Sequence, residues 1–475
     1  MATTLLWFRQ DLRLTDNSAL LSAAARGAVL PFYILDTTDP WAPGSASRWW
    51  LHHALQSLAT QLQRLGGRLL LFRGDPKLII PQLVKATQAD GVMWNRCYEP
   101  HAIARDSAIK AALRQQGLKV ETFAASLLFE PWEIQTQNET PYRVFTPYFK
   151  ACLNLQRQHK PVPAPTKLTC HPYTGGEKLT DWHLVPTHPN WAKNFDWNPT
   201  QQGAQLALQT FLVQAVADYT TARDFPARTG TSRLSPYLHF GQISPREIWH
   251  ATDQAMVETQ PGLINGGESF LREIIWREFC HHLLYYQPEM PEQPLQEPFA
   301  RFPWRSDAEA LLCWQRGRTG YPIVDAGMRQ LWQTGWMHNR VRMIVSSFLV
   351  KDLLLPWQDG AAWFWDTLVD ADLANNAAGW QWVAGCGADA APYFRIFNPW
   401  LQSRKFDPMG AYIRRFVPEL AGLPSDLIHE PSAASPDDLL AAGVELGNTY
   451  PWPMLDHKAA KERALAALEQ IKVAS

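Results

Sequence analysis

The chain has 475 residues, 46% hydrophobic and 19% charged, which is enough for two or three domains with real cores and excludes a disordered protein. Its formal net charge of -1 excludes binding to nucleic acid through overall positive charge, so any contact with DNA needs a local basic surface. The six cysteines form no C-x-x-C pair and no Cys or His spacing suits a metal, so we expect a reduced, cytoplasmic protein without a metal site.

The N-terminal segment is apolar only briefly. Its apolar run is followed by the charged residues Arg9 and Asp11. No later apolar run is both long and free of charged residues. A signal peptide needs a longer apolar core, and a membrane-spanning helix needs about 20 apolar residues. We therefore expect neither.

The first part of the chain alternates between short apolar runs and amphipathic stretches. Residues 4–8 and 28–36 are apolar runs typical of buried strands. The stretch 47–67 carries leucines on one helical stripe and ends at two glycines. A strand, a helix and a further strand are expected between residues 68 and 96. This alternation predicts a doubly wound parallel sheet, in an α/β domain that we place at residues 1–135.

The second part of the chain has a different character. Proline and turn residues predict a long linker over residues 136–200, most clearly after residue 160. Beyond it, strand patterns fade and helical periodicity predicts an all-helical domain at 201–475. We expect helices at 205–222, 269–286, 324–335, 336–355, 361–376 and 458–475, the fourth ended by Pro356.

One stretch, DADLANNAAGWQW at residues 370–382, concentrates acids, amides and indoles without any basic residue. Its acids, Asp370 and Asp372, need cations from elsewhere in the chain. Arg342 is expected to face inward on its helix, and an unpaired buried charge is costly. The two acids are its candidate partners, and a purely structural ion pair is the alternative.

Two other stretches could carry chemistry. RTGTSRLS, at 228–235, offers hydroxyls that cap a helix or, with free N–H groups, suit a phosphate; the stretch alone favours capping. One helical turn carries Glu273, Trp276 and Arg277. This arrangement could bind a flat heterocycle with hydrogen-bonding edges. The alternative is a core indole beside a surface acid. The G-x-G-x-x-A match at 385–390 follows no strand, so we interpret it as a turn.

These stretches together resemble the photolyase/cryptochrome family. The resemblance runs from WFRQDLRLTDN at residues 7–17 to APYFRIFNP at 391–399, and it is very specific between residues 319 and 399. It implies an N-terminal α/β domain that binds an antenna chromophore, a linker, and a C-terminal helical domain that binds FAD without a Rossmann motif. Within the family the chain is most similar to bacterial photolyases for cyclobutane pyrimidine dimers.

The resemblance implies light-driven DNA repair. Excited reduced FAD donates an electron to a dimer flipped out of the DNA, the ring splits and the electron returns. Photolyases for the other dimer type, (6-4) photoproducts, carry histidines where this chain has Asn339 and Met343, and signalling cryptochromes carry Cys or Asp where it has Asn376. The alternatives are a cryptochrome-type blue-light photoreceptor without repair activity and, more remotely, a dark flavin oxidoreductase.

Carried over position by position, the resemblance implies a FAD site in the helical domain. The residues implied to bind the cofactor are Tyr219, Thr231, Ser232, Arg233, Leu234, Ser235, Phe270, Glu273, Arg277, Asn339, Arg342, Asp370, Asp372 and Asn376. Arg342 is implied to pair with Asp370. Asn376 is implied to face the flavin N5 atom, where an amide can donate or accept a hydrogen bond. Phe270 stands where relatives often carry Trp.

The resemblance also implies a DNA site and an electron-transfer chain. The residues implied to touch DNA or the lesion are Arg223, Glu273, Trp276, Arg340, Met343, Trp382, Arg395 and Lys405. Two of these, Trp276 and Trp382, are implied to wall the dimer, and Glu273, Asn339 and Asn376 are the implied catalytic residues. An electron-transfer triad is implied at Trp304, Trp357 and Trp380.

The antenna chromophore is expected to be methenyltetrahydrofolate in a variant binding mode, with 8-hydroxy-5-deazaflavin as the alternative. His101 and Ala102 stand where the folate-binding pattern has an Asn-Glu pair. The deazaflavin pattern is met in part, with Arg48 suitable but His239 in place of a lysine. We expect the partner to be DNA containing pyrimidine dimers, and the protein to be a monomer.

Overall fold

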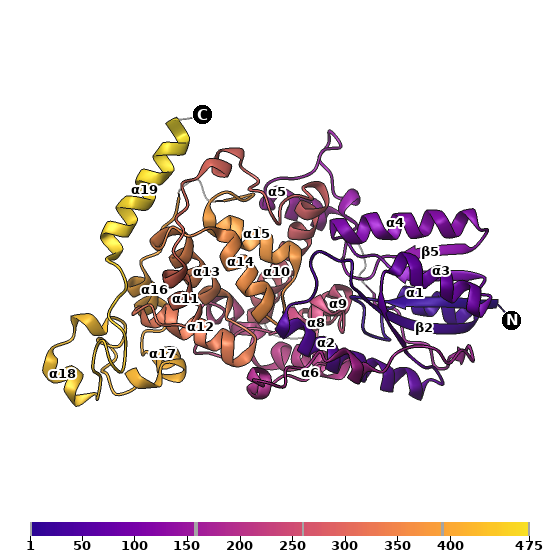
Figure 1. Ribbon diagram of the computed structural model, residues 1–475, viewed down its shortest axis with the longest axis horizontal. Helices are drawn as coiled ribbons and strands as arrows, with labels where there is room; N and C mark the ends of the chain where they lie inside the picture. The colour runs from indigo at the N-terminus through magenta and orange to yellow at the C-terminus, as the bar shows by residue number, and fades with distance from the viewer. Residues whose placement is uncertain (1, 156–159, 259–260, 391–393, 474–475) are drawn as a thin grey trace.

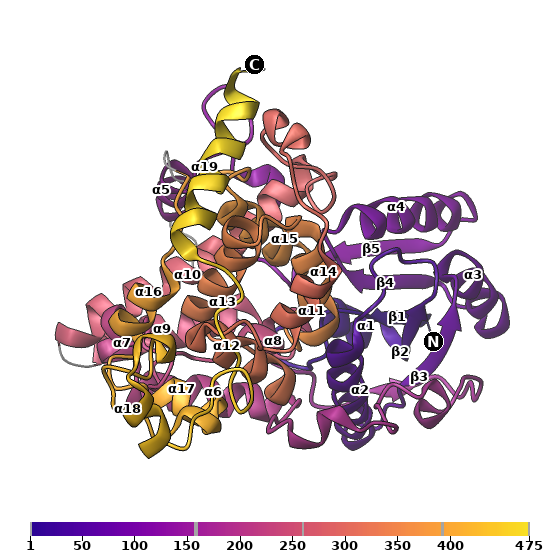
Figure 2. The ribbon, with the colours of Figure 1, turned by 60° about the vertical axis from the view of Figure 1, so that its left-hand side comes forward.

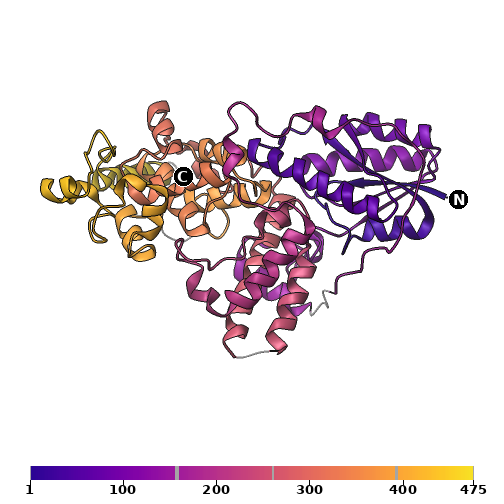
Figure 3. The same ribbon diagram turned by 90° about the horizontal axis from the view of Figure 1, so that it is seen from below.

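The computed structural model describes residues 2–155, 160–258, 261–390 and 394–473. Figure 1 shows an α/β part beside a larger helical part, with the N-terminus at the outer end of the sheet and the C-terminus at the end of a projecting helix. Seen from below, the helices coloured magenta and pink form a lobe between the sheet and the C-terminal helices (Figure 3). No helix among the described residues is long and apolar enough to cross a membrane.

The N-terminal sheet is parallel, with strand order β3-β2-β1-β4-β5. Its strands are β1 (Ala2–Phe8), β2 (Gly27–Asp36), β3 (Leu70–Gly74), β4 (Gly91–Asn95) and β5 (Lys119–Phe123). The connecting helices are α1 (Ser18–Arg26), α2 (Ser45–Arg64), α3 (Pro76–Thr87) and α4 (Pro100–Gln115). The predicted doubly wound parallel sheet is therefore confirmed.

Side chains of the central strands alternate between two separate cores. Leu6 and Phe8 of β1 pack in one cluster with residues of α1 and α2, while Leu5 and Trp7 pack in another with residues of α3 and α4. This follows from the two-residue period of a strand, which sends successive side chains to opposite faces. Helices cover both faces of the sheet. The strands are therefore continuous apolar runs in the sequence.

The stretch assigned to the linker contains more regular structure than expected. It includes α5 (Phe145–Asn154), which packs on the helical domain, and β6 (Thr169–Cys170), which adds to the sheet by pairing with β2. The proline-rich remainder forms short 3-10 turns at Leu179–Trp182 and Trp191–Asn194. The proposed domain boundaries at residues 135 and 200 stay predictions.

The C-terminal part is helical throughout, as expected. Its helices are α6 (Gln201–Gln214), α7 (Tyr219–Ala222), α8 (Ser235–His239), α9 (Pro245–Glu258), α10 (Pro261–Tyr286), α11 (Ala308–Gln315), α12 (Pro322–Thr334), α13 (Asn339–Ser347), α14 (Trp357–Thr367), α15 (Leu373–Ala384), α16 (Pro399–Phe406), α17 (Ala411–Phe416), α18 (Pro436–Ala441) and α19 (His457–Val473). Figure 2 shows α19 standing out from the body, near α13 and α15 in that view.

Two of the expected long helices are divided. The helix predicted at 205–222 breaks at Ala215. Just after the break, the carbonyl of Val216 lies so close to α10 that a Cβ on Gly266 would be 1.7 Å from it. The helix predicted at 336–355 starts later, at Asn339, and changes to a π-helical turn at Phe348–Asp352. Such turns are often found at functional sites.

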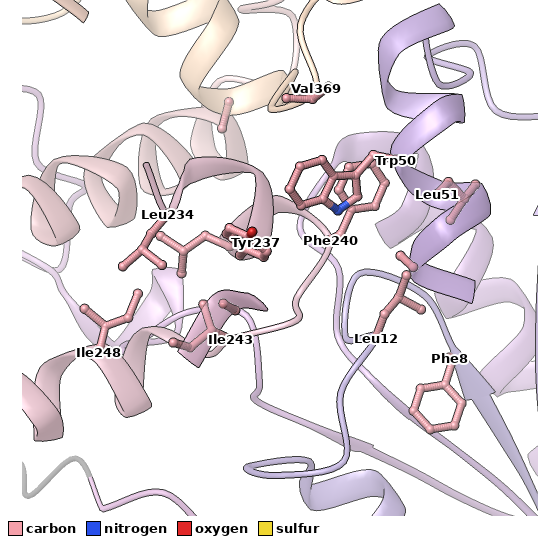
Figure 4. Packing of buried hydrophobic residues seen from close by; sticks show 14 of the residues in the cluster. Phe8, Leu12, Trp50, Leu51, Leu234, Tyr237, Phe240, Ile243, Ile248 and Val369 are labelled. Atoms are coloured by element: carbon pink, nitrogen blue, oxygen red, sulfur yellow. The ribbon is translucent and has the colours of Figure 1, made fainter. Parts of the chain in front are cut away.

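The two parts of the chain share one core. Trp50 of α2 packs on Tyr237 at 5.0 Å and on Phe240 at 6.0 Å between ring centroids, and its Nε1 donates to Gln242 Oε1 at 2.8 Å (Figure 4). Nearby, the hydroxyl of Ser45 donates to Asp366 at 2.7 Å. This common core holds α8 and α14 in fixed positions relative to the sheet.

Candidate functional site

The acids of the DADLANN stretch lie in the connection between two helices. The single helix predicted at 361–376 is wrong, because α14 ends at Thr367 and α15 starts at Leu373. Asp372 has extended backbone angles, and its side chain accepts from the backbone N–H of Asn375 at 2.9 Å. An aspartate at this position satisfies free N–H groups at the start of a helix, which explains where α15 begins.

Asp370 joins three separate elements. Arg342 of α13 donates from Nη2 to both carboxylate oxygens, at 2.8 and 3.1 Å, and Ser235 of α8 donates its hydroxyl to Oδ2 at 2.6 Å. The predicted pairing of Arg342 with Asp370 is thus confirmed. The Asp370 side chain is 2% exposed and that of Arg342 is 24% exposed, so the carboxylate is buried while the guanidinium is partly open.

Asp372 has different partners. Its Oδ2 atom lies 3.5 Å from His239 Nδ1 and 3.5 Å from His281 Nε2. Burial alone would raise the pKa of Asp372, but the two imidazoles and their hydrogen bonds hold it well below its usual range. Of the two acids considered as partners for Arg342, only Asp370 is paired with it.

The segment expected to face phosphate lies beside Asp370. Thr231 and Ser232 are half-buried, while Arg233 and Ser235 are exposed. The expected capping of the next helix is wrong, because α8 has Leu234 at its N-cap with no side-chain hydrogen bond, and the Ser235 hydroxyl goes to Asp370. The exposed guanidinium of Arg233 and the half-buried hydroxyls of Thr231 and Ser232 do not cap this helix.

Arg233 adopts an unusual conformation for its residue type. Its φ angle is +52°, in the left-handed region that costs energy for residues with a Cβ. The guanidinium lies over the rings of Trp197, at 4.1 Å, and Trp336, at 5.3 Å from the centroid. These cation–π contacts fix the side chain beside the phosphate-facing segment.

Tyr219, Phe270 and Glu273 meet around one arginine. Arg223 donates to Glu273 at 2.6 Å, and its guanidinium lies 5.2 Å from the centroid of Tyr219. Tyr219 and Phe270 are buried and contact one another at 5.6 Å between centroids. Glu273 is thus held in place by Arg223, one of the residues predicted to touch DNA.

Trp276 is backed by a residue that the sequence analysis missed. Its ring stacks on Phe145 with centroids 3.5 Å apart and planes 6° apart. Phe145 belongs to α5, within the stretch assigned to the linker. The aromatic and apolar periodicity of FTPYFKACL could have revealed this helix, but its contact with α10 arises only in the folded chain. Trp382, the second predicted wall, is half-buried on α15.

Asn339, Arg340 and Met343 lie at the start of α13. Asn339 is exposed, and Arg340 pairs with Asp224 at 2.7 Å and lies 3.7 Å from Met343 Sδ. Two more predicted DNA contacts, Arg395 and Lys405, are exposed, and Arg340 stacks on Phe406 beside Lys405. The start of the APYFRIFNP stretch, residues 391–393, lies outside the described residues.

Asn376 and Trp380 project from successive turns of α15. Asn376 donates its Nδ2 to the carbonyl of Ala361 at 3.0 Å, which orients the amide. Trp380 is buried against Phe364 and Trp314, at 5.0 and 6.2 Å between centroids.

The other two indoles of the predicted triad are separate from Trp380 in the chain. Trp357 is buried at the first position of α14, and Trp304 is half-buried against Phe302 at 4.4 Å between centroids. Electron transfer along the three indoles stays a prediction.

Arg277 points toward the α/β domain. Its Nη1 donates to the carbonyl of Ser126 at 2.7 Å and lies 3.5 Å from Glu278. The implied role of Arg277 at the cofactor stays a prediction, and its observed contacts are structural. Among the described residues, no group of three or more His, Cys, Asp or Glu side chains could hold a metal ion.

A cavity of about 130 Å³ lies where the sheet meets the helical part. Polar and charged residues at the carboxyl ends of the strands line it, together with His239 from α8; they include Arg9, Asp36, Glu99 and Arg105. Ligands in such sheets bind outside the carboxyl ends, where the strand order reverses. Here that point lies between β1 and β4.

Comparison with known proteins decides the family. Residues 4–166 match DNA photolyase, and residues 270–470 match the FAD binding domain of DNA photolyase. A deoxyribodipyrimidine photo-lyase from Agrobacterium fabrum is 51% identical over 99% of this chain and 98% of its own length. The chain belongs to the photolyase/cryptochrome family. Its cofactor is FAD, as the matched domain indicates.

Within the photolyase/cryptochrome family, this chain has relatives of both kinds. Cryptochrome-2 from Arabidopsis thaliana is 39% identical over 99% of this chain and 79% of that protein. The crystal structure of a bacterial class III photolyase from Agrobacterium tumefaciens has a TM-score of 0.96 and 51% identity, covering 99% of this chain and 98% of that one. Of these three proteins, the two from Agrobacterium have the higher identity to this chain.

Proposed function

We propose that this chain is a deoxyribodipyrimidine photo-lyase that repairs cyclobutane pyrimidine dimers in DNA in the light. The observation that carries the proposal is the 51% identity, over nearly the whole of both chains, to an enzyme of that name. A photoreceptor without repair activity is the second candidate, because a plant cryptochrome is 39% identical over 99% of the chain.

The residues around Asp370 fit FAD. The exposed Arg233 and the partly exposed Arg342 supply the cationic donors that a diphosphate needs. In addition, the indole N–H of Trp336 is buried and has no hydrogen-bond acceptor among the described residues. When bound, FAD supplies the light absorption and the electron that splits the dimer.

The chain's own residues hold and orient the reactants. The amide of Asn376 donates to the Ala361 carbonyl and, among the described residues, its oxygen stays free to accept a hydrogen bond from the cofactor. Glu273, held by Arg223, accepts hydrogen bonds from a base edge, and Asn339 offers a second polar contact. Trp276 and Trp382 form apolar walls that exclude water and hold the flipped-out dimer.

Basic residues place the DNA. Arg223, Arg340, Arg395 and Lys405 contact phosphates, which explains DNA binding by a chain with a net charge of -1. Arg340 also pairs with Asp224, and Arg223 with Glu273.

The antenna chromophore is methenyltetrahydrofolate in our proposal, with 8-hydroxy-5-deazaflavin as the alternative. The cavity at the carboxyl ends of β1, β2 and β4 supports a second chromophore near the helical domain, since Arg9 and Arg105 lie among its lining residues. Mass spectrometry of the released chromophores distinguishes the two molecules. We also propose that the protein acts as a cytoplasmic monomer, in keeping with its free cysteines.

The test is repair of an oligonucleotide with a single thymine dimer under blue light and in the dark. A photo-lyase restores the intact strand only in the light, whereas a photoreceptor reduces its flavin in the light and leaves the dimer unchanged. Trp304→Phe is expected to slow photoreduction of oxidised flavin and to spare repair by protein reduced beforehand.

A further inference from the structure

The two acids at the start of α15 are neutralised in different ways. Asp370 pairs with Arg342, whose charge is permanent at all physiological pH values. Asp372 lies between His239 and His281, each 3.5 Å from its Oδ2 atom, and imidazoles titrate near neutral pH. The side chains of Asp372, His239 and His281 are 6%, 12% and 5% exposed, so water does not replace a lost charge there.

We propose that His239 and His281 form a bracket around Asp372, and that the charge of the positioning residue His281 makes the retention of FAD dependent on pH. The inference rests on the proposed cofactor site, because it concerns the helix that carries Asn376 to that site. His281 comes from α10 and His239 from α8, so the bracket also ties both helices to the start of α15.

The second carboxylate oxygen of Asp372 connects the bracket to the rest of α15. Oδ1 accepts from the backbone N–H of Asn375 at 2.9 Å and from its Nδ2 at 2.8 Å, which caps α15. Asn376 and Trp380 follow on the same helix. An ionised Asp372 without a nearby cation would be a buried unpaired charge, so it would turn to solvent or take up a proton. Either change weakens the cap and moves the cofactor side of α15.

Each element around Asp372 contributes to the charge balance. On α10, Arg277 opposes protonation of His281, Glu278 favours it, and Cys280 is a neutral thiol because burial raises its pKa to about 12. Arg342 on α13 and Asp370, in the connection between α14 and α15, cancel one another.

The direction of the pH effect follows from these contacts. Burial lowers the pKa of His281, but Asp372 outweighs it, so the pKa lies above the ordinary value. The stabilisation is therefore complete below the ordinary histidine pKa and is lost as pH rises through the raised one. His239 also lines the cavity where the sheet meets the helical part.

The test measures the dissociation constant of FAD from the holoprotein at several pH values. We expect it to rise about fivefold or more between pH 6 and pH 9, the lower end of typical coupling between two sites. His281→Gln should raise it at pH 6 and flatten the profile, whereas His281→Arg, with a permanent charge, should keep it low and flat. A flat wild-type profile, or a His281→Gln profile parallel to wild type, would overturn the inference.

A control comes from the neighbouring histidine. Burial lowers the pKa of His282 to about 4, so it stays neutral above pH 6, and His282→Gln should keep the wild-type pH profile. If His281→Gln does not fold, NMR titration of the histidines in the wild-type protein is the test. The absence of any histidine with a raised pKa would contradict the bracket. Failure to bind FAD at any pH would overturn the proposed function itself, and the inference with it.

Discussion

Arg342 Nη2 lies 2.8 and 3.1 Å from the two carboxylate oxygens of Asp370. Arg342→Ala should lower the free energy of unfolding by about 3–5 kcal/mol, because it leaves a buried carboxylate without its cation. Urea unfolding measures this loss, and absorption of the purified protein should show that FAD is lost as well.

The control for that variant is the exposed pair of Arg404 with Glu430, whose side chains are 43% and 24% exposed. Arg404→Ala should cost no more than about 1 kcal/mol, since water and salt screen surface pairs. Equal losses of unfolding free energy in the two variants would mean that burial of Asp370 does not strengthen its ion pair.

Gly360 on α14 leaves room for Trp380, because a Cβ there would lie 2.1 Å from Cη2 of the indole. Gly360→Ala should destabilise the protein by about 1–3 kcal/mol and slow photoreduction of bound FAD as the indole is displaced. Gly379, on α15, has no atom within 4 Å of an added Cβ. Gly379→Ala should therefore stabilise the protein by about 0.5–1 kcal/mol and leave photoreduction unchanged.

Phe145 supports Trp276 from behind, with the ring centroids 3.5 Å apart. Phe145→Ala should weaken binding of dimer-containing DNA while leaving affinity for undamaged DNA unchanged, because the wall loses its backing but the phosphate contacts remain. Fluorescence anisotropy with matched duplexes measures both. Trp132→Ala, which removes a 42% exposed indole that contacts Tyr285 at 5.6 Å between centroids, should change neither. Unchanged binding by Phe145→Ala would contradict the support role.

Glu278 couples stability to pH. Its Oε2 accepts from the backbone N–H groups of Leu128 and Phe129, and burial raises its pKa to about 7. The folded chain thus binds this proton more tightly than the unfolded chain, and the stabilisation is lost as pH rises from about 4 to 7. Glu278→Gln keeps an acceptor but cannot ionise, so thermal unfolding should show a relative gain of up to about 3 kcal/mol above pH 7.5. Parallel pH profiles for the two proteins would rule this out.

Lys405 is exposed near Arg340, at the surface proposed to hold DNA. Lys405→Ala should weaken binding to damaged and undamaged DNA alike and reduce the slope of log affinity against log salt by about 0.9, the value for one lost phosphate contact. Lys472→Ala, at the far end of α19 and paired with Glu469, should leave the slope unchanged.

Periodicity and composition were enough to predict the doubly wound sheet and the helical domain, because strand and helix periods are local properties of the chain. The inward Arg342 and its need for an acid also followed from sequence, since the cost of a buried charge does not depend on the fold. The resemblance added the residues of the cofactor and lesion sites, whose roles remain to be tested.

Tertiary structure alone decided the rest. The helix expected through Asp370 and Asp372 is interrupted, because Asp372 caps the start of α15. Local propensity does not decide between a continuous helix and a new cap at such residues. Arg342 pairs with Asp370, whereas Asp372 lies between His239 and His281. Phe145 stacks on Trp276. Each of these contacts joins residues far apart in the chain, so only the packing of α5, α8, α10 and α13 determines which side chains meet.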